Sequence, residues 1–144
     1  MEKIASFQKD HDKLMPGFYL SGTANGVSTF DLRFKKPNQG DFIAQPALHS
    51  IEHIMATVLR NGGHKNDIVY FGPMGCRTGF YLLTVNMDEK TVRNTLKEAL
   101  AAALDFDSVP GAEKAECGNY LDHDLNGAKK ECAEYLRLLE GQDD

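Results

Sequence analysis

The stretch PALHSIEHIMATVLRNGG, residues 46–63, specifies the fold more strongly than any other part of the sequence. Its proline suits the first turn of a helix, and the pair Gly62–Gly63 predicts where that helix ends. Between them, apolar side chains recur at helical spacing, at Leu48, Ile51, Met55, Val58 and Leu59. We therefore predict an amphipathic helix with one buried face, which needs a second layer to pack against.

The same helix carries two histidines and an acid, His49, His53 and Glu52. On a helix, residues four apart lie about 40° apart around the axis and roughly 6 Å along it, so both rings can hold one metal ion. The pattern H-x-x-E-H is the signature of inverted zinc peptidases, in which the acid is a general base. An ordinary polar helix face explains the pattern as well, so the motif alone leaves both interpretations open.

Strand-like stretches lie on both sides of this helix. Residues 27–34, VSTFDLRF, alternate apolar and polar side chains, which predicts a half-buried strand. Residues 67–72, DIVYFG, and 80–86, FYLLTVN, are two more strand-like runs, joined by a loop rich in glycine and proline. We expect these two runs to pair as antiparallel neighbours.

Two more helices are predicted toward the C-terminus. Asn86 resembles the N-cap of a helix that runs to about Leu104. Residues 127–140, GAKKECAEYLRLLE, form the last helix, with Asp124 or Asn126 as its cap.

The order of these elements indicates the fold class. The segment between the last two helices is irregular, with a short strand expected near Cys117. No repeat or linker divides the chain, so residues 1–144 form a single domain. Strands separated by three helices predict an α+β fold, an antiparallel sheet with helices packed on one face.

Composition excludes several classes of function. The net charge of -5 argues against binding nucleic acid or an anionic membrane, which needs a basic surface. No apolar run is long enough to span a membrane, and the first 13 residues are too polar for a secretory signal. Three cysteines, an odd number, indicate reduced thiols and a cytoplasmic protein.

The cysteines and the loop histidines differ in their sequence context. Cys76 lies in GPMGCRTGF, where glycines and a following arginine favour an exposed thiolate over a buried small side chain. Cys117, in AECGNY, is either structural or the third ligand of a metal held by the two helix histidines, with one position open. Cys132 lies on an apolar stripe and is expected in the core. His64 and His123 are expected to be surface loop residues.

Five motifs, in this order and spacing, resemble those of the LuxS family, the S-ribosylhomocysteine lyases that act as autoinducer-2 synthases. They are SFQKDH, FDLRF, HSIEH, GPMGCRTGFY and ECG. The resemblance extends from about Ser6 to Leu139, and PMGCRTGFY is its longest and most specific motif.

This resemblance implies a fold and a reaction. The fold would be a four-stranded antiparallel sheet with helices, related to that of the inverted zinc peptidases, in a homodimer with two sites at its interface. The reaction would cleave the thioether of S-ribosylhomocysteine to homocysteine and 4,5-dihydroxy-2,3-pentanedione, through carbonyl migration and β-elimination. The product would serve quorum sensing or a step in the activated methyl cycle.

The resemblance also implies roles for individual residues. His49, His53 and Cys117 would bind one Fe(II) per subunit, which Zn(II) or Co(II) can replace. Glu52 and Cys76 would be the two acid–base residues. The residues expected to line the substrate pocket are Ser6, Phe7, His11, Arg33, Arg60, Tyr70 and Tyr81, of which the first three would reach across to the partner's pocket.

Lys35 replaces a cysteine that follows FDLRF in the family. Two further departures lie just before PMGCRTGFY. The family reads DISPMGC where this chain reads YFGPMGC, so Tyr70 replaces an aspartate beside the sugar and Gly72 replaces a serine. A phenol still hydrogen-bonds a hydroxyl group, but it is larger and uncharged at neutral pH. We therefore expect the pocket to differ from the family at this point.

Two other functions stay open at the level of the sequence. The motif H-x-x-E-H by itself allows a small metallopeptidase, with Glu52 as the base and no role for Cys76. The presence of Tyr70 allows a divergent member with an altered substrate, or a module that binds a ligand without turnover. Release of a thiol from S-ribosylhomocysteine discriminates between these functions and the lyase.

Overall fold

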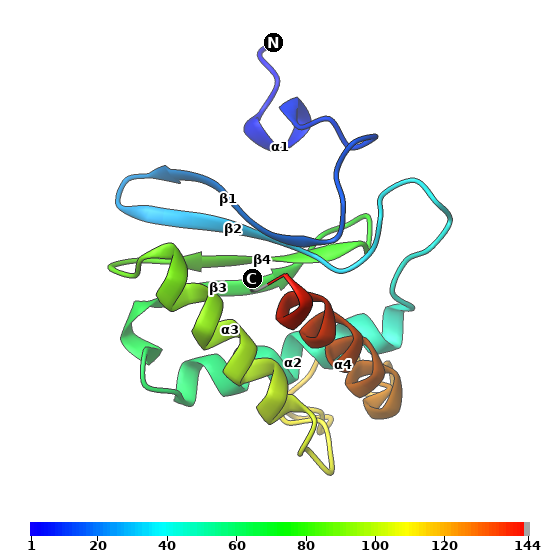
Figure 1. Ribbon diagram of the computed structural model, residues 1–144. Coiled ribbons are helices and arrows are strands. Elements are labelled where there is room, and N and C mark those ends of the chain that lie inside the picture. The colour runs from blue at the N-terminus through cyan, green and yellow to red at the C-terminus, as the bar shows by residue number, and fades with distance from the viewer. Residues whose placement is uncertain (143–144) are drawn as a thin grey trace.

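Figure 1 shows a computed structural model of the chain, which describes residues 1–142. The elements in chain order are α1 (Ala5–Gln8), β1 (Gly17–Ala24), β2 (Val27–Arg33), α2 (Gln45–Asn61), the 3-10 turn η1 (Lys65–Asp67), β3 (Ile68–Pro73), β4 (Gly79–Thr84), α3 (Glu89–Ala103) and α4 (Leu125–Gly141). The four strands form one sheet in the order β1-β2-β4-β3, and all neighbours are antiparallel. The predicted α+β class with a four-stranded antiparallel sheet is confirmed.

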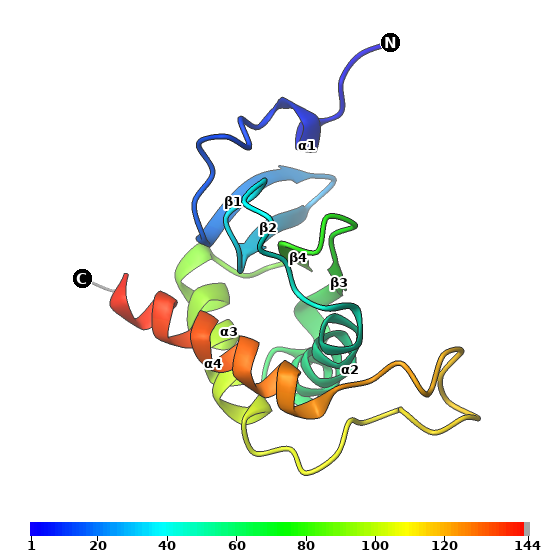
Figure 2. The same cartoon turned by 90° about the vertical axis from the view of Figure 1, so that its right-hand side faces the viewer.

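The molecule has two main layers. The helices α2, α3 and α4 cover one face of the sheet, and the short α1 lies over the opposite face, as Figure 1 and Figure 2 show. The buried apolar side chains of these helices meet those of β2 and β4 in one core. The outer face of the sheet is therefore left to the N-terminal segment alone.

The helix predicted from residues 46–63 is α2. Pro46 lies in its first turn, and Gly62 is its C-cap residue, as predicted. The predicted apolar stripe is buried, except that Val58 is only partly buried and Ile54 completes the face. Because this face packs on the sheet and on the other two helices, the opposite flank is free to carry polar groups.

The strand β1 was not predicted. Only its first two residues are buried, so it lacks the alternation that marks a half-buried strand. The turn to β2 is formed by Asn25 and Gly26, whose φ values of 54° and 78° suit a tight hairpin. The dipeptide Asn-Gly was the available signal for this hairpin.

Side-chain caps fix the starts of the last two helices. Asn86 does not cap α3, because Asp88 does so, with its Oδ1 accepting a hydrogen bond from the Thr91 N–H at 2.8 Å. In α4, Asp124 Oδ1 accepts from the Gly127 N–H at 2.9 Å, so one of the two predicted caps is confirmed. No helix within residues 1–142 is both long and apolar enough to cross a membrane.

Candidate active site

Three histidines and one cysteine lie together between α2 and the α3–α4 loop (residues 104–124). The ligand atoms of His49, His53, Cys117 and His123 all lie within 4.8 Å of one another. The Cys117 Sγ is 3.5 Å from His49 Nε2, 3.9 Å from His53 Nε2 and 3.7 Å from His123 Nε2. The fold therefore brings the three predicted metal ligands together, with a fourth residue beside them.

Hydrogen bonds determine which ring nitrogen of His49 and His53 faces the cluster. The His49 Nδ1 lies 2.7 Å from the carbonyl oxygen of Asp122, and the His53 Nδ1 lies 2.9 Å from that of Pro110. A carbonyl oxygen only accepts, so each Nδ1 carries a proton and each Nε2 presents a lone pair to the cluster. Two imidazole lone pairs and a thiol are a donor set that fits a divalent metal ion such as iron, zinc or cobalt.

The prediction that His123 is a surface loop residue is wrong. Its ring stacks on that of His49, with centroids 4.0 Å apart, and its Nδ1 lies 3.0 Å from Ser50 Oγ. Burial, followed by the charges of the neighbouring His49 and His53, lowers the pKa of His123. One sign of this position is present in the sequence. His123 lies six residues after Cys117, so a single loop can place both side chains at the same site.

The sulfur of Cys117 is positioned by turns. Within residues 1–142 no strand forms in the α3–α4 loop, so the prediction of a short strand near this residue is wrong. The Cys117 N–H donates to the Glu113 carbonyl at 3.0 Å, which closes a turn just before the sulfur. The φ of 65° at Gly111 turns the chain where the preceding carbonyl accepts from His53.

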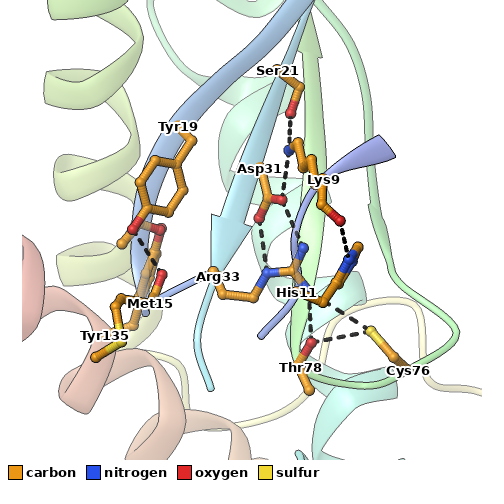
Figure 3. Close-up of polar contacts among 11 residues, drawn as sticks. Lys9, His11, Met15, Tyr19, Ser21, Asp31, Arg33, Cys76, Thr78 and Tyr135 are labelled. Carbon is orange, nitrogen blue, oxygen red and sulfur yellow. Dashed lines mark hydrogen bonds and ion pairs between the residues drawn. The ribbon is translucent and has the colours of Figure 1, made fainter. Parts of the chain in front are cut away.

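A second group of polar residues surrounds Cys76, at the turn between β3 and β4 (Figure 3). The exposed thiol lies 3.1 Å from Thr78 Oγ1 and 3.9 Å from Arg33 Nη1. Arg33 Nη1 also donates to Thr78 Oγ1 at 2.7 Å, which leaves the Thr78 hydroxyl proton free to point at the sulfur.

Buried charges lie behind this thiol. Arg33 and Asp31 are almost fully buried and form a two-point ion pair, with Nε and Nη2 donating to the carboxylate at 3.1 and 2.7 Å. Lys9, from the N-terminal segment, donates to the same carboxylate at 2.9 Å. Two cations thus share one carboxylate in the group behind Cys76 (Figure 3).

These neighbours stabilise the thiolate. Burial by itself raises the pKa of Cys76, but the hydrogen bond with Thr78 and the charge of Arg33 outweigh it, and the pKa lies below the ordinary value of a thiol. Cys132 is the opposite case, because burial in the core raises the pKa of this thiol to about 12. The prediction that Cys132 packs in the core is confirmed.

Replacing Thr78 by valine should raise the pKa of Cys76. The thiolate loses its hydroxyl donor, so alkylation by iodoacetamide shifts to higher pH and slows at pH 7. Mass spectrometry of the Cys76 peptide, from protein treated at a series of pH values, measures this shift. Thr57→Val removes a hydroxyl that lies on α2 and should leave the profile unchanged. An unchanged or lower midpoint in Thr78→Val would contradict this account.

Backbone geometry holds the Cys76 turn against β2. Gly79 pairs with Arg33, and a side chain at Gly79 would collide with the carbonyl oxygen of Leu32. Arg77, with a φ of 61°, reverses the chain and places its guanidinium 4.4 Å from the centroid of the Phe42 ring. The glycine therefore allows the turn to come close enough for Arg33 to reach the thiol.

Two hollows adjoin the Cys76 group and the outer face of the sheet. The larger, of about 680 Å³, lies between the N-terminal segment and the sheet, and Ser6, Tyr70 and Tyr81 are among its lining residues. The smaller, of about 320 Å³, is lined in part by His11 and Cys76. Most of the predicted substrate contacts therefore border these two hollows.

The other predicted site residues lie elsewhere. Phe7 is exposed on α1, and Arg60 lies at the end of α2, where its Nη2 donates to the carbonyl of Val69 at 3.2 Å. Neither borders the two hollows. Glu52 is partly buried next to His53, and among residues 1–142 it has no hydrogen-bond or ion-pair partner, so its carboxylate is available for proton transfer.

The departures from the family pattern at Tyr70 and Gly72 are physically linked. A Cβ atom at Gly72 would overlap the phenol of Tyr70, two residues earlier on β3. The tyrosine ring therefore occupies the space that a serine side chain would need. Tyr70 is one of the residues that line the larger hollow.

Tyr70 and Gly72 should be energetically coupled. Gly72→Ser should destabilise the chain by displacing the ring, and it should cost less when Tyr70→Asp has already removed that ring. We expect a coupling free energy of at least about 0.5 kcal/mol. Urea unfolding of the two single variants, the double variant and the parent measures it. Additive free energies of unfolding would show that the two positions are independent.

The sequence is similar to known proteins over nearly its whole length. The family model described as S-Ribosylhomocysteinase (LuxS) matches residues 4–143. The chain is 47% identical to an S-ribosylhomocysteine lyase of Borrelia garinii subsp. bavariensis, over 96% of this chain and 93% of the relative. It is 46% identical to that of Phocaeicola vulgatus, over 94% and 89%, and 44% identical to that of Porphyromonas gingivalis, over 95% and 91%. The similarity thus covers both groups of site residues.

Proposed function

Because this chain belongs to the LuxS family of S-ribosylhomocysteine lyases, we propose that its two groups of polar residues divide the work of one reaction. The chain is a carbon–sulfur lyase that acts on S-ribosylhomocysteine. The metal cluster between α2 and the α3–α4 loop binds the ion, and Cys76 and Glu52 move protons. The observation that carries this proposal is the cluster itself, in which two imidazole lone pairs and a thiol face one point.

His49, His53 and Cys117 are the proposed ligands, with Fe(II) as the ion and Zn(II) or Co(II) as substitutes. When bound, the metal supplies a Lewis acid that polarises the sugar's carbonyl and hydroxyl oxygens. Three protein ligands leave a coordination position for substrate, as catalytic sites need.

The chemistry explains why two proton carriers are needed. The thioether carbon, C5, is not activated, so the C5–S bond can break only when a carbonyl stands at C3 and a proton leaves C4. The carbonyl must therefore move from C1 to C3, and each move takes a proton from one carbon and returns it to the neighbouring one. Cys76 as thiolate and Glu52 as carboxylate carry these protons, and each such transfer is typically worth about 10²–10⁴-fold in rate.

The products follow from the final elimination. Loss of the C4 proton expels the thiolate of homocysteine, which then takes up a proton. The five-carbon fragment that remains is an enol, which loses its hydroxyl proton, gains a proton at the terminal carbon and so becomes 4,5-dihydroxy-2,3-pentanedione. No step changes the overall redox state. The positive charge of Arg33 beside Cys76 helps to keep the base ionised.

Substrate contacts are proposed for the residues at the two hollows. Ser6, Tyr70 and Tyr81 would hold one side of the substrate, and His11 would lie beside Cys76 on the other. Phe7, Arg33 and Arg60 are proposed as further contacts, because the resemblance to the family implies them. The hydroxyl of Tyr70 would bind a sugar hydroxyl as donor or acceptor, in place of a carboxylate.

We further propose that two copies of the chain share each site. In one chain, the turn between β3 and β4 lies at the sheet, and the α3–α4 loop lies across α2 from it (Figure 1 and Figure 2). Among residues 1–142, no hydrogen bond joins Cys76 or Arg33 to the cluster. A two-fold homodimer would bring the Cys76 of one copy to the metal of the other. The three free cysteines support a cytoplasmic location for this dimer.

Thiol release tests the proposed function. The protein is purified without oxygen, loaded with Fe(II) or the less easily oxidised Co(II), and mixed with S-ribosylhomocysteine. Steady release of free thiol that is lost in Glu52→Gln supports the proposal. Metal-loaded protein that releases no thiol would show that the pocket has changed its substrate or has stopped catalysing.

A further inference from the structure

The group of possible metal ligands has four members, His49, His53, Cys117 and His123, and the proposed ligand set uses the first three. We infer that His123 is not a fourth ligand but a positioning residue, whose Nε2–H donates a hydrogen bond to the thiolate of Cys117. This inference rests on the proposed metal site and assigns a role to a residue that the three-ligand set leaves out. The evidence for this inference is the pair of hydrogen bonds made by Ser50, on the buried face of α2.

Ser50 determines which nitrogen of His123 carries the proton. Its side chain is fully buried, and its Oγ has two hydrogen-bonding contacts among the described residues. One is the Asp124 N–H, at 2.9 Å, which can only donate to it. The other is His123 Nδ1, at 3.0 Å.

The hydroxyl of Ser50 can donate one hydrogen bond. If His123 Nδ1 also donated to Oγ, the buried hydroxyl proton would have no acceptor, which is unfavourable for a group shielded from water. If Oγ instead donates to Nδ1, every group is satisfied. In the neutral ring, the proton of His123 then lies on Nε2.

This tautomer is the reverse of that in the two ligands. His49 and His53 donate from Nδ1 to carbonyl oxygens and present lone pairs to the cluster. The Nε2 of His123 presents an N–H at 3.7 Å from Cys117 Sγ. The Asn119 N–H lies 3.5 Å from the same sulfur, so two donors point at the thiolate.

Two N–H donors on the sulfur have a chemical consequence. They withdraw electron density from the thiolate, which therefore gives less charge to the metal, and the ion stays a stronger acceptor for substrate oxygens. A ring that offers a proton also cannot occupy the remaining coordination position. His123 thus keeps that position open for substrate while holding the sulfur in place.

Long-range ¹H–¹⁵N correlation spectra of the zinc-loaded, ¹⁵N-labelled protein test this directly, because the nitrogen shifts separate protonated, bare and metal-coordinated ring nitrogens. We expect His49 and His53 to show protonated Nδ1 and coordinated Nε2. We expect His123 to show a bare Nδ1 and a protonated Nε2. A coordinated Nε2 in His123 would overturn the inference, and uncoordinated rings at His49 and His53 would overturn the proposed metal site itself.

Two variants supply readouts that a merely structural role would not move. Ser50→Ala removes the hydroxyl proton, so the His123 signals should shift toward a mixture of both tautomers, whereas Thr57→Ala on the same helix should leave them unchanged. His123→Phe keeps a ring to stack on His49 but has no N–H. In the Co(II)-loaded form, it should move the thiolate-to-cobalt charge-transfer band to lower energy with the d–d bands unchanged. A change in the d–d bands that marks the loss of a nitrogen ligand would contradict the inference.

Discussion

Replacing Cys76 by alanine should lower kcat for thiol release from S-ribosylhomocysteine by about 10²–10⁴-fold, with the metal ion retained. The thiol lies at the exposed β3–β4 turn, where Thr78 and Arg33 hold its pKa below the ordinary value. Alanine cannot carry a proton, and no other thiol borders the two hollows. The loss should therefore fall on kcat, measured with a thiol reagent under saturating substrate.

Two comparisons make this result specific. Cys76→Ser keeps a hydrogen-bonding group, but its pKa is far too high for a base, so it should be nearly as inactive as alanine. Cys132→Ala removes a thiol that is buried in the core and should retain turnover. Normal turnover by Cys76→Ala, with metal content equal to that of the parent, would rule out the proposed proton carrier.

Replacing Cys117 by alanine should abolish metal binding. The sulfur is the common neighbour of three histidine rings, and it is the one proposed ligand that adds negative charge. We expect affinity to fall by more than the roughly 10–100-fold that follows loss of a ligand's hydrogen-bond partner. Elemental analysis after dialysis against a chelator measures the metal per chain, and thiol release should fall in parallel.

The control for this variant is a histidine outside the cluster. His64→Ala removes a ring that lies beside η1 and near Asp67, outside the cluster, and should leave metal content unchanged. Cys117→Ala that keeps one equivalent of metal through the same dialysis would show that the ion is bound elsewhere. A loss of metal without a loss of thiol release would contradict the need for the ion.

The fold was predictable wherever a side-chain pattern repeats. The buried face of α2 follows from apolar spacing, and Asp124 follows from its capping chemistry. The strand β1 was not predicted because most of this edge strand is exposed, so no alternation of apolar and polar residues is imposed. There the turn at Asn25 and Gly26 was the better guide, because its backbone geometry depends on residue type and not on burial.

The candidate site was predictable for residues that lie within short motifs. His49 and His53 share one helix face, so their spacing alone places them together. The contacts of Cys76 with Arg33 and Thr78 depend on the pairing of β2 with β4, which no local pattern specifies. Asp31 and Lys9 were missed for the same reason, since a buried ion pair reads in sequence as ordinary surface charge.

His123 shows a further limit. Its context, in a polar loop, is typical of a surface residue, and only the folding of the α3–α4 loop onto α2 brings it to the cluster. The tautomer of each ring depends on a contact with a distant residue, such as Ser50 or Pro110. A sequence can therefore indicate a metal site without indicating which histidine serves as ligand and which as donor.

The most direct test of the shared site is complementation between two inactive variants. Cys76→Ala and His53→Ala are unfolded together, refolded as an equal mixture and loaded with Co(II), so that half of the dimers are mixed. If Cys76 of one copy works on the metal of the other, each mixed dimer has one intact site. Thiol release should then recover to about one quarter of that of the parent. A mixture with no more activity than the separate variants would contradict the shared site, and with it the proposed arrangement of this enzyme.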